Sequence, residues 1–361
     1  MRVFINGRFA IQPMSGVQRY ASEIVRALDQ MGNRRPDLTF ELLSPPGAPD
    51  AGLRNIPQRW IGLGSGHAWE QSWFGRAARD GVALSLAMSG PIFHPRQIVV
   101  LHDAAVHRHP EFFSPRYAAA HRVIERQLAR RATIATVSHF SRRELAAVLG
   151  IGEAAILLAP NGADHARVCT DPSIVGRFGL DGRPFFLTLG NLTANKNLAV
   201  VLRALGRIAD PALRVVAVGE QRRSVFGTIA LTDDLRLILA GRLTDPEVAG
   251  LMRQARALIF PSRYEGFGLP PLEAMAIGCP VLASNCDAVV EVCGGAAEHF
   301  RADDDAALAS LMAAALTDDG SWRVRRVAAG LDRANQYRWE DSVRALVEAC
   351  AALADRRAIA A

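Results

Sequence analysis

Short apolar runs alternate with longer amphipathic stretches along most of the chain. In the first half, runs rich in β-branched residues predict buried strands at residues 3–5, 98–101, 132–137 and 155–159. Between them, apolar residues recur three and four positions apart, which predicts helices at residues 16–31, 116–131 and 141–149. Residues 44–66 are rich in Pro and Gly, and we expect a loop there.

The pattern breaks in the middle of the chain and then restarts. Residues 163–184 hold turn-forming pairs such as Asp171–Pro172 and Asp181–Gly182, which indicate a domain boundary. Further strands are predicted at residues 185–189, 214–218, 235–239, 257–260 and 280–283. Further helices are predicted at residues 197–208, 246–256 and 270–277, followed by a largely helical C-terminus.

Strands that alternate with helices of this length are typical of parallel sheets covered by helices on both faces. We therefore expect an α/β protein with two doubly wound, Rossmann-like domains facing a central cleft. The first domain is predicted at residues 1–170 and the second at 171–340, and a final helix over 341–361 can cross back to the first. In this architecture ligands bind beyond the carboxyl ends of the strands.

Composition narrows the class of protein. Half of the 361 residues are hydrophobic and 22% are charged, which is typical of globular chains. No apolar run approaches the length of a membrane span, and the N-terminus lacks the features of a secretory signal. The five Cys residues form no paired framework, which favours a reducing compartment. We therefore expect a cytoplasmic protein, at the inner face of the cell membrane if its basic half binds lipid.

Positive charge is concentrated in the first half. Residues 1–170 carry a net charge of +7 and the remainder −1, which favours an acidic partner: a nucleic acid, an anionic membrane or a phosphorylated substrate. Arg makes up 41 of the 42 basic residues, and the sole Lys is Lys196. A compact ammonium and a flat guanidinium are not interchangeable at a tight site, so this Lys is a candidate functional residue.

The segment 261–279, PSRYEGFGLPPLEAMAIGC, carries the most specific chemistry. Its glycines let the backbone approach a ligand, and the N–H groups at the start of the following helix suit a phosphate. Glu273 is predicted in the first turn of that helix, where a carboxylate can accept two hydroxyl hydrogen bonds, and Glu265 lies just ahead. The alternative is that both glutamates only complement the helix dipole.

The string EGFGLPPLEAM resembles the E-x7-E segment of the retaining family 4 (group 1) glycosyltransferases of the GT-B fold. Five further segments resemble motifs of that family in the same order: Gly16–Tyr20, His102–Asp103, Val137–Ser141, Pro160–Asp164 and Gly190–Leu198. The glycine loop and the EGFGLPPLEAM string lean toward bacterial mannosyl- and rhamnosyltransferases.

The resemblance implies an acceptor-binding first domain and a second domain that binds a nucleotide sugar. It places Lys196 and Gly16 at the diphosphate, Glu273 at the ribose, and Glu265 and His102 at the transferred sugar. The catalytic residues it implies are His102, Glu265 and Lys196. The donor-binding residues are Gly16, Asn191, Lys196, Arg242, Glu265, Gly266, Phe267, Gly268, Leu269 and Glu273. Arg19 and Asp103 are assigned to the acceptor.

One departure from the family concerns the cations at the diphosphate. Asn195 and Asn191 stand where relatives often have basic residues. Lys196 then carries more of the neutralisation, helped by Arg242 or Arg19. No metal ligand is assigned.

The implied activity is retaining transfer of a hexose, mannose or rhamnose-like, from a nucleotide-diphosphate sugar to a glycan or lipid-linked acceptor. The product would be a bacterial surface polysaccharide such as lipopolysaccharide. A GDP-sugar is favoured as donor, with no metal or other cofactor, no nucleic acid, and an anionic membrane as a peripheral partner. Two alternatives stay open: a sugar-nucleotide epimerase or hydrolase on the same fold, and a basic membrane- or nucleic-acid-binding protein without catalysis.

Other signals have simpler explanations. The D-x-D at Asp303–Asp305 precedes a helical run and is expected to cap it. The spacing of Cys279, Cys286, Cys293 and His299 is wider than that of most zinc sites. Asp164–His165 is expected to be a solvated loop. Arg122, Arg126, Arg130 and Arg131 form either a solvated helix face or a patch for anionic lipid, with Trp69, Trp73 and Phe74 as its apolar side or as core.

Overall fold

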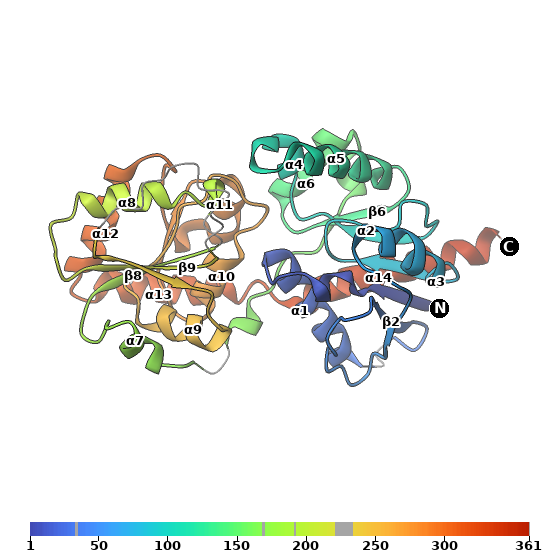
Figure 1. Cartoon of the computed structure of the whole chain (residues 1–361), viewed down its shortest axis with the longest axis horizontal. Helices are drawn as coiled ribbons and strands as arrows, with labels where there is room; N and C mark the ends of the chain where they lie inside the picture. The colour runs from blue at the N-terminus through green and yellow to red at the C-terminus, as the bar shows by residue number, and fades with distance from the viewer. Residues whose placement is uncertain (33–34, 168–169, 191–192, 221–233, 361) are drawn as a thin grey trace. The chain divides into compact units, whose positions relative to one another are not determined.

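The computed structural model describes residues 1–360, apart from 33–34, 168–169, 191–192 and 221–233. The chain divides into two units. The first comprises Met1–Gly162 with Arg338–Ala361, and the second comprises Ala163–Tyr337. Each unit is a parallel sheet flanked by helices (Figure 1).

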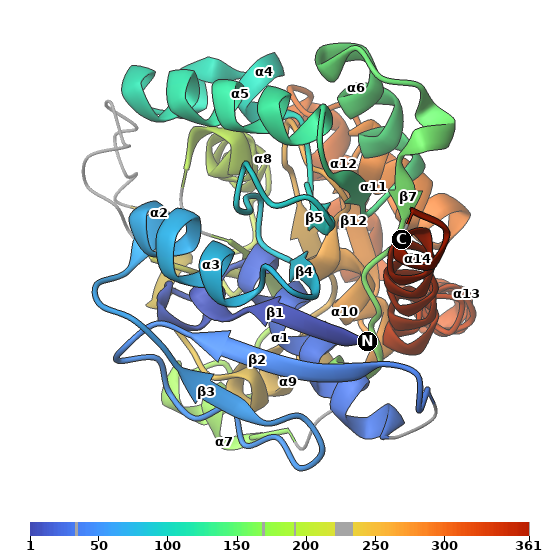
Figure 2. The same cartoon turned by 90° about the vertical axis from the view of Figure 1, so that its right-hand side faces the viewer.

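The sheet of the first unit has seven strands in the order β3-β2-β1-β4-β5-β6-β7. Figure 2 shows β1 to β4 side by side, with β3 at the edge. The strands are β1 (Arg2–Asn6), β2 (Thr39–Ser44), β3 (Gln58–Trp60), β4 (Val82–Ser85), β5 (Gln97–Val100), β6 (Thr133–Thr136) and β7 (Leu157–Leu158). The main helices are α1 (Gly16–Met31), α2 (Gly66–Trp69), α3 (Gly75–Ala77), α4 (Ala105–Arg108), α5 (Pro115–Ala129), α6 (His139–Leu149) and α14 (Trp339–Ala360).

The sheet of the second unit has six described strands in the order β10-β9-β8-β11-β12-β13. They are β8 (Phe185–Leu189), β9 (Arg214–Val218), β10 (Leu237–Gly241), β11 (Leu258–Phe260), β12 (Val281–Ser284) and β13 (Glu298–Phe300). The helices are α7 (Ser173–Arg177), α8 (Leu198–Gly206), α9 (Asp245–Gln254), α10 (Leu269–Ala276), α11 (Asp287–Cys293), α12 (Asp305–Thr317) and α13 (Ser321–Ala334). The two doubly wound sheets confirm the predicted fold class.

Both sheets reverse their strand order once, and this sets the place of the site. In the first unit the reversal lies between β1 and β4, and in the second between β8 and β11, where Leu258 pairs with Leu187. Ligands of doubly wound sheets bind at such a switch point, at the carboxyl ends of the strands. The core strands are buried because both faces of each sheet are covered by helices, as the apolar runs predict.

Residues 44–66 are not all loop, contrary to the prediction, because they contain the strand β3. This strand pairs with β2 at the sheet edge, and its residues Arg59 and Trp60 are exposed. An edge strand has one free side and needs no apolar run, so its sequence resembles a loop. The C-terminus is likewise interrupted by the short edge strand β13.

The unit boundaries differ from the predicted ones by a few residues. Residues 163–167 belong to the second unit, because Ala163 donates a backbone hydrogen bond to Tyr337 and the following helical turn packs against α10. At the other end, α14 packs against α1, β4, β5 and β7 of the first unit. Its residues Val343, Leu346 and Cys350 are fully or almost fully buried there. None of the described helices is both long and apolar enough to cross a bilayer.

Candidate active site

The loop after β8 brings Lys196 to the carboxyl end of the second sheet. Gly190 has a φ of +137°, and a Cβ there would lie 3.3 Å from the Lys196 side chain, so glycine lets the lysine stem rest on the backbone. Asn197 closes the loop in the left-handed region, with a φ of 54°. Its Nδ2 donates to the carbonyls of Pro261 and Ala302, which fixes the loop against the ends of neighbouring elements.

The segment after β11 lies beside this loop and pairs with it. The Arg263 N–H donates to the Asn195 carbonyl, and Lys196 Nζ lies 2.5 Å from Glu265 Oε1. Both side chains are partly exposed, at 24% for Lys196 and 16% for Glu265. The sole lysine and the first glutamate of the motif therefore form one ion pair at the switch point, as expected from adjacent parallel strands.

Helix α10 begins at Leu269, and Gly268 precedes it with a φ of 101°. A Cβ at Gly268 would lie 3.2 Å from Val289, so no larger residue fits that turn without a shift. Phe267 is buried against Tyr337, edge to face. Gly266, Phe267, Gly268 and Leu269 thus form a fixed turn at a helix N-terminus, an arrangement that favours anions.

Glu273 lies in the second turn of α10, because the helix starts at Leu269; the expected place in the first turn is wrong by one turn. Its Oε1 accepts a hydrogen bond from His165 Nε2 at 2.9 Å, and the two side chains are 21% and 10% exposed. The expectation that His165 lies in a solvated loop is therefore also wrong. Neither glutamate of the motif acts only on the helix dipole, since each has a specific side-chain partner.

In the first unit, α1 starts at Gly16 beyond the carboxyl end of β1. Apart from the adjacent residues and the backbone of α1, no atom of the described residues lies within 4 Å of a Cβ placed at Gly16. The protein's own packing therefore does not require glycine at this position. Arg19, one turn further, lies 3.7 Å from Glu23 and is largely buried.

His102 follows β5 and is 7% exposed. Its Nε2–H donates to the Leu86 carbonyl at 3.0 Å, and Tyr20 meets the ring edge to face. Burial lowers the pKa of His102 to about 4, so the ring is neutral at physiological pH and keeps Nδ1 as an acceptor. Asp103 accepts a hydrogen bond from the Ala105 N–H, which places it at the start of α4.

The remaining predicted residues have ordinary surroundings. Arg242 lies 3.4 Å from Glu220, with both side chains about half exposed. Asn191 lies outside the described residues. Asp304 accepts from the Ala307 N–H, which confirms the capping role of the Asp303–Asp305 segment.

The cysteines of the second unit do not gather into a metal site in the part of the chain that the structure describes. Burial raises the pKa of the Cys279 and Cys293 thiols to about 12, which keeps them protonated. His299 is occupied by the carbonyls of Ser284 and Gly294.

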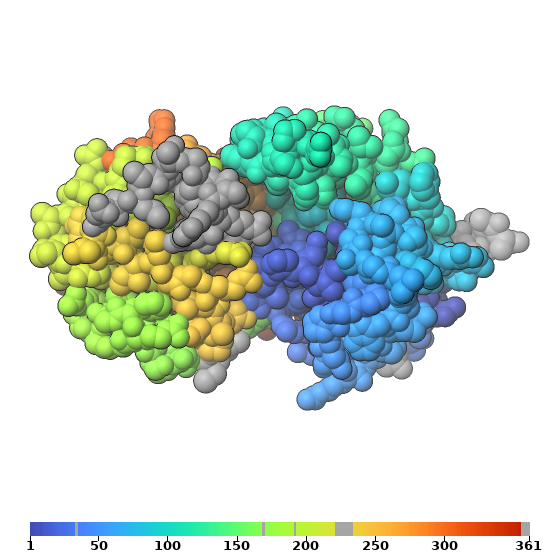
Figure 3. Space-filling view, viewed as in Figure 1, coloured from blue at the N-terminus to red at the C-terminus, as the bar shows by residue number. Residues whose placement is uncertain are grey.

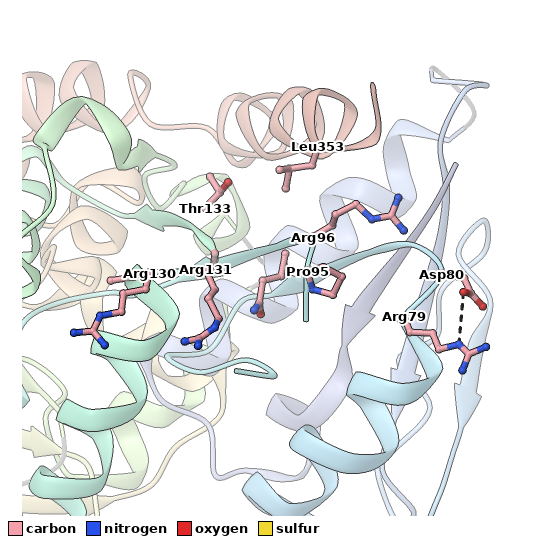
Figure 4. A pocket seen from close by; sticks show the side chains of 11 residues that line it. Arg79, Asp80, Pro95, Arg96, Arg130, Arg131, Thr133 and Leu353 are labelled. Carbon is pink, nitrogen blue, oxygen red and sulfur yellow. Dashed lines mark ion pairs between the residues drawn. The ribbon is translucent and has the colours of Figure 1, made fainter. Parts of the chain in front are cut away.

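A cavity of about 610 Å³ lies elsewhere, at the amino ends of β5 and β6 (Figure 4). Its lining includes Arg79, Arg96, Arg130 and Arg131. Since it is at the opposite edge of the sheet from His102, it is not part of the predicted site.

Comparison with known proteins agrees with this geometry. Residues 174–330 match the family described as glycosyl transferases group 1. The O-antigen chain mannosyltransferase B of Escherichia coli is 27% identical over 292 residues, which cover 76% of this chain and 75% of the relative. The serotype-specific mannosyltransferase WbdA of Escherichia coli is 30% identical over 173 residues, 45% of this chain and 21% of WbdA.

Among solved structures, Anabaena Alr3699/HepE in complex with UDP and glucose superposes with a TM-score of 0.76 at 17% identity. The superposition covers 98% of this chain and all of HepE. The solved structures show that the chain has the GT-B fold. The match of residues 174–330 to the group 1 family model and the mannosyltransferase relatives support glycosyltransferase activity.

Proposed function

We propose that the protein is a retaining hexosyltransferase that takes its sugar from a nucleotide diphosphate without a metal ion. The observation that carries this proposal is the Lys196–Glu265 pair, held at the switch point beside the fixed N-terminus of α10. It supplies a cation for the diphosphate and a carboxylate for the sugar within one ion pair. The proposed donor site also includes Glu273, Arg242 and the turn Gly266–Leu269. Asn191 is assigned to it from the sequence motif alone.

 In this turn, the backbone N–H groups of Phe267, Gly268 and Leu269 are proposed to bind a phosphate of the donor.

Charge development explains why these groups suit the reaction. As the bond between C1 of the sugar and the phosphate oxygen breaks, its electron pair moves to the departing diphosphate. Lys196 and the N–H groups at the start of α10 are already in place to stabilise that charge, so no reorganisation is needed during the step. Binding of the diphosphate exchanges the Lys196–Glu265 contact for a Lys196–phosphate contact, which frees Glu265 to accept from the sugar hydroxyls.

The acceptor hydroxyl then forms the new bond to C1 on the face that the diphosphate leaves. Its proton passes to the departing phosphate oxygen, so atoms and charge balance without a dedicated protein base. His102 is neutral, and its Nδ1 can accept a hydrogen bond from the sugar. We assign it to sugar positioning and not to nucleophilic attack. Gly16 leaves room for the diphosphate, and Arg19 and Asp103 are proposed to serve the acceptor.

The relatives point to the substrate class. Two of them carry mannosyltransferase names, one for an O-antigen chain, which supports a mannose or rhamnose-like donor and a glycan or lipid-linked acceptor in bacterial surface polysaccharide synthesis. A GDP-sugar is the favoured donor. No further cofactor is proposed.

The first test is a thermal-shift screen against nucleoside diphosphates and their sugars, with magnesium and with EDTA. A ligand at 100 times its Kd stabilises a protein by about 2.7 kcal/mol, which such a screen detects. We expect one base to stabilise the protein equally in both conditions. A shift that requires magnesium would contradict metal independence, and no shift with any nucleotide would contradict the donor site.

A second measurement separates the proposed transferase from an epimerase or hydrolase. Donor alone should be turned over slowly, and addition of the glycan acceptor should produce a glycoside with the anomeric configuration of the donor, read by NMR. Rapid loss of the donor without an acceptor would favour the epimerase or hydrolase.

We further propose that the first unit contacts an anionic membrane through the amino edge of its sheet. The arginines of the cavity in Figure 4 outnumber its one acidic residue, Asp80. Phe93 is 83% exposed and lies under the Arg131 guanidinium. Trp73 is 44% exposed but packs against Gly62, beyond the carboxyl end of β3, and is not part of this edge. Helix α5, which ends beside the cavity, is on the surface of this unit (Figure 3). Trp69 and Phe74 are core residues and take no part.

Vesicle sedimentation tests this contact. Binding to vesicles with anionic lipid should exceed binding to neutral ones, and it should fall with salt and in the double variant Arg130→Glu and Arg131→Glu. The matched control is the double variant Arg301→Glu and Arg325→Glu, which reverses two exposed arginines of the second unit. Equal binding by both variants would exclude the arginine-lined edge as the contact.

A further inference from the structure

His165 lies immediately after the Pro160–Asp164 segment, within a helical turn, Asp164–Ala166. Two backbone hydrogen bonds hold this turn: the Ala163 N–H donates to the Tyr337 carbonyl, and the Ala166 N–H to the Ala163 carbonyl. The turn packs against α10, and the His165 side chain is 10% exposed. The backbone thus delivers the imidazole directly to the second glutamate of the motif.

The contact defines the protonation of the ring nitrogen. His165 Nε2 is 2.9 Å from Glu273 Oε1. An ionised carboxylate only accepts hydrogen bonds, so Nε2 carries the proton and donates it. Among the described residues, none bonds to Oε2 of Glu273, which therefore remains an acceptor.

We propose that His165 is a positioning residue that orients Glu273 for the vicinal hydroxyls of the donor ribose. The inference rests on the proposed donor site. A glutamate side chain has several rotatable bonds, and a ligand that has to order it loses affinity. The hydrogen bond from His165 orders it in advance while leaving one oxygen and the negative charge for the ribose.

The two carboxylates of the motif therefore differ in what donor binding demands. Glu265 must give up Lys196 before the diphosphate and sugar can be bound as proposed. Glu273 keeps His165 throughout, because a carboxylate oxygen has two lone pairs and Oε2 is not used by the histidine. His165 thus contributes to ribose binding without touching the reacting atoms.

The experiment compares two probes by calorimetry: the nucleoside diphosphate that stabilises the protein most, and its 2′,3′-dideoxy analogue. The ratio of their Kd values isolates the contribution of the ribose hydroxyls. The variants are His165→Ala, His165→Phe, which keeps a ring but has no N–H, and His165→Gln, whose amide can donate to Glu273. His109→Ala is the matched control, since His109 also pairs with a glutamate, Glu111, at 3.0 Å.

For the wild type we expect the ribose compound to bind about tenfold more tightly or better, the typical value of one hydrogen bond to a charged group. His165→Ala and His165→Phe should lose most of that preference with unchanged affinity for the dideoxy compound and unchanged kcat at saturating donor. His165→Gln should restore part of it. In a Glu273→Ala background, a further His165→Ala change should have no effect on the ratio.

Three other results would overturn the positioning role of His165. If His165→Phe, folded by circular dichroism, keeps the wild-type ratio, the positioning role is overturned while the donor site stands. A loss of affinity for both compounds alike, in all three variants, would show a structural role only and would also overturn it. If the wild type binds the nucleotide but does not distinguish the two compounds, the ribose role of Glu273 fails first, and His165 fails with it.

Discussion

Both sheets are doubly wound, but the side chains at their carboxyl edges differ in burial and charge. In the first unit, His102 and Tyr20 are buried and neutral, and each is bonded to a backbone carbonyl: His102 to Leu86, and Tyr20 to Ala159. In the second unit, they are partly exposed and paired with one another, as Lys196 with Glu265 and Glu273 with His165. A buried neutral group keeps its one partner, whereas a partly exposed ion pair can exchange partners with a charged ligand. This difference is consistent with the donor site proposed for the second unit.

The largest expected effect is the loss of turnover when the Lys196–Glu265 pair of the second unit is broken. Lys196→Ala should lower kcat by about 100-fold to 1,000-fold, the typical loss when one preorganised charge-stabilising group is removed. The fold should be retained, because the Lys196 side chain is partly exposed. Steady-state kinetics with a saturating donor measure the effect, and Glu265→Gln serves as the partner variant. Near-wild-type turnover in Lys196→Ala would remove lysine from the diphosphate.

The next largest effect concerns the buried His102 of the first unit and the pH dependence of the free energy of unfolding. The pKa of His102 is about 4 in the folded protein, below its ordinary value of 6.5, so the unfolded chain binds a proton that the folded one does not. The stability from this group is present above pH 6.5 and is lost as pH falls toward 4. One pKa unit corresponds to about 1.4 kcal/mol, so about 2 kcal/mol should be lost between pH 7 and pH 5.

Urea unfolding of the wild type and His102→Asn at both pH values measures this loss. His121, whose pKa is also about 4 because it is buried, contributes in the same direction, and Glu125, whose pKa is raised by burial, contributes in the opposite direction. Both are present in the variant, so the difference between the two proteins reports His102. Identical pH dependence would mean that His102 is not held neutral by burial.

A smaller effect, on nucleotide affinity, is expected when Glu273 is changed. Glu273→Ala should raise the Kd of the nucleoside diphosphate about tenfold and leave kcat with saturating donor nearly unchanged, since the carboxylate binds ground state and transition state alike. Calorimetry and initial rates give the two quantities. An equal fall in kcat and kcat/KM would instead place Glu273 at the reacting atoms.

The smallest expected effect tests whether the donor diphosphate binds next to Gly16. Because a Cβ at Gly16 would contact none of the described side chains, Gly16→Ala should leave the free energy of unfolding within about 0.5 kcal/mol of wild type. A several-fold weaker donor affinity in this stable variant would report a ligand in that space. Unchanged affinity and turnover would show that the glycine loop does not approach the diphosphate.

The sequence predicts only part of the fold: the interior strands β2 and β4 of the first sheet were not predicted, and neither was the edge strand β3. Helix α1 and strands β8 and β9 have the predicted bounds, because burial on one or both faces imposes a clear apolar period. Strand β3 was expected to be loop, since edge strands are under no such constraint. The local pattern also gives no strand order, and it is this order that places the loops after β8 and β11 next to each other.

The same limit applies to the site. Lys196, Glu265 and Glu273 were found from local motifs, but their partners depend on the tertiary fold. His165 is separated from Glu273 by 108 positions, and nothing in its own neighbourhood distinguishes it from a solvated residue. The one usable signal is its place directly after a strand and a Pro-Asn-Gly turn, at the carboxyl end of a parallel sheet.

The return of α14 to the first unit has a consequence for synthesis on the ribosome. Residues 163–337 form the second unit in one continuous stretch, whereas the first unit needs residues from both sides of it. Val343, Leu346 and Cys350 fill the first core but emerge from the exit tunnel after the whole second unit. Domains fold as units during translation, so the second unit can be complete while the first still waits for its last helix. The part of the protein that is translated first is therefore the part that finishes folding last.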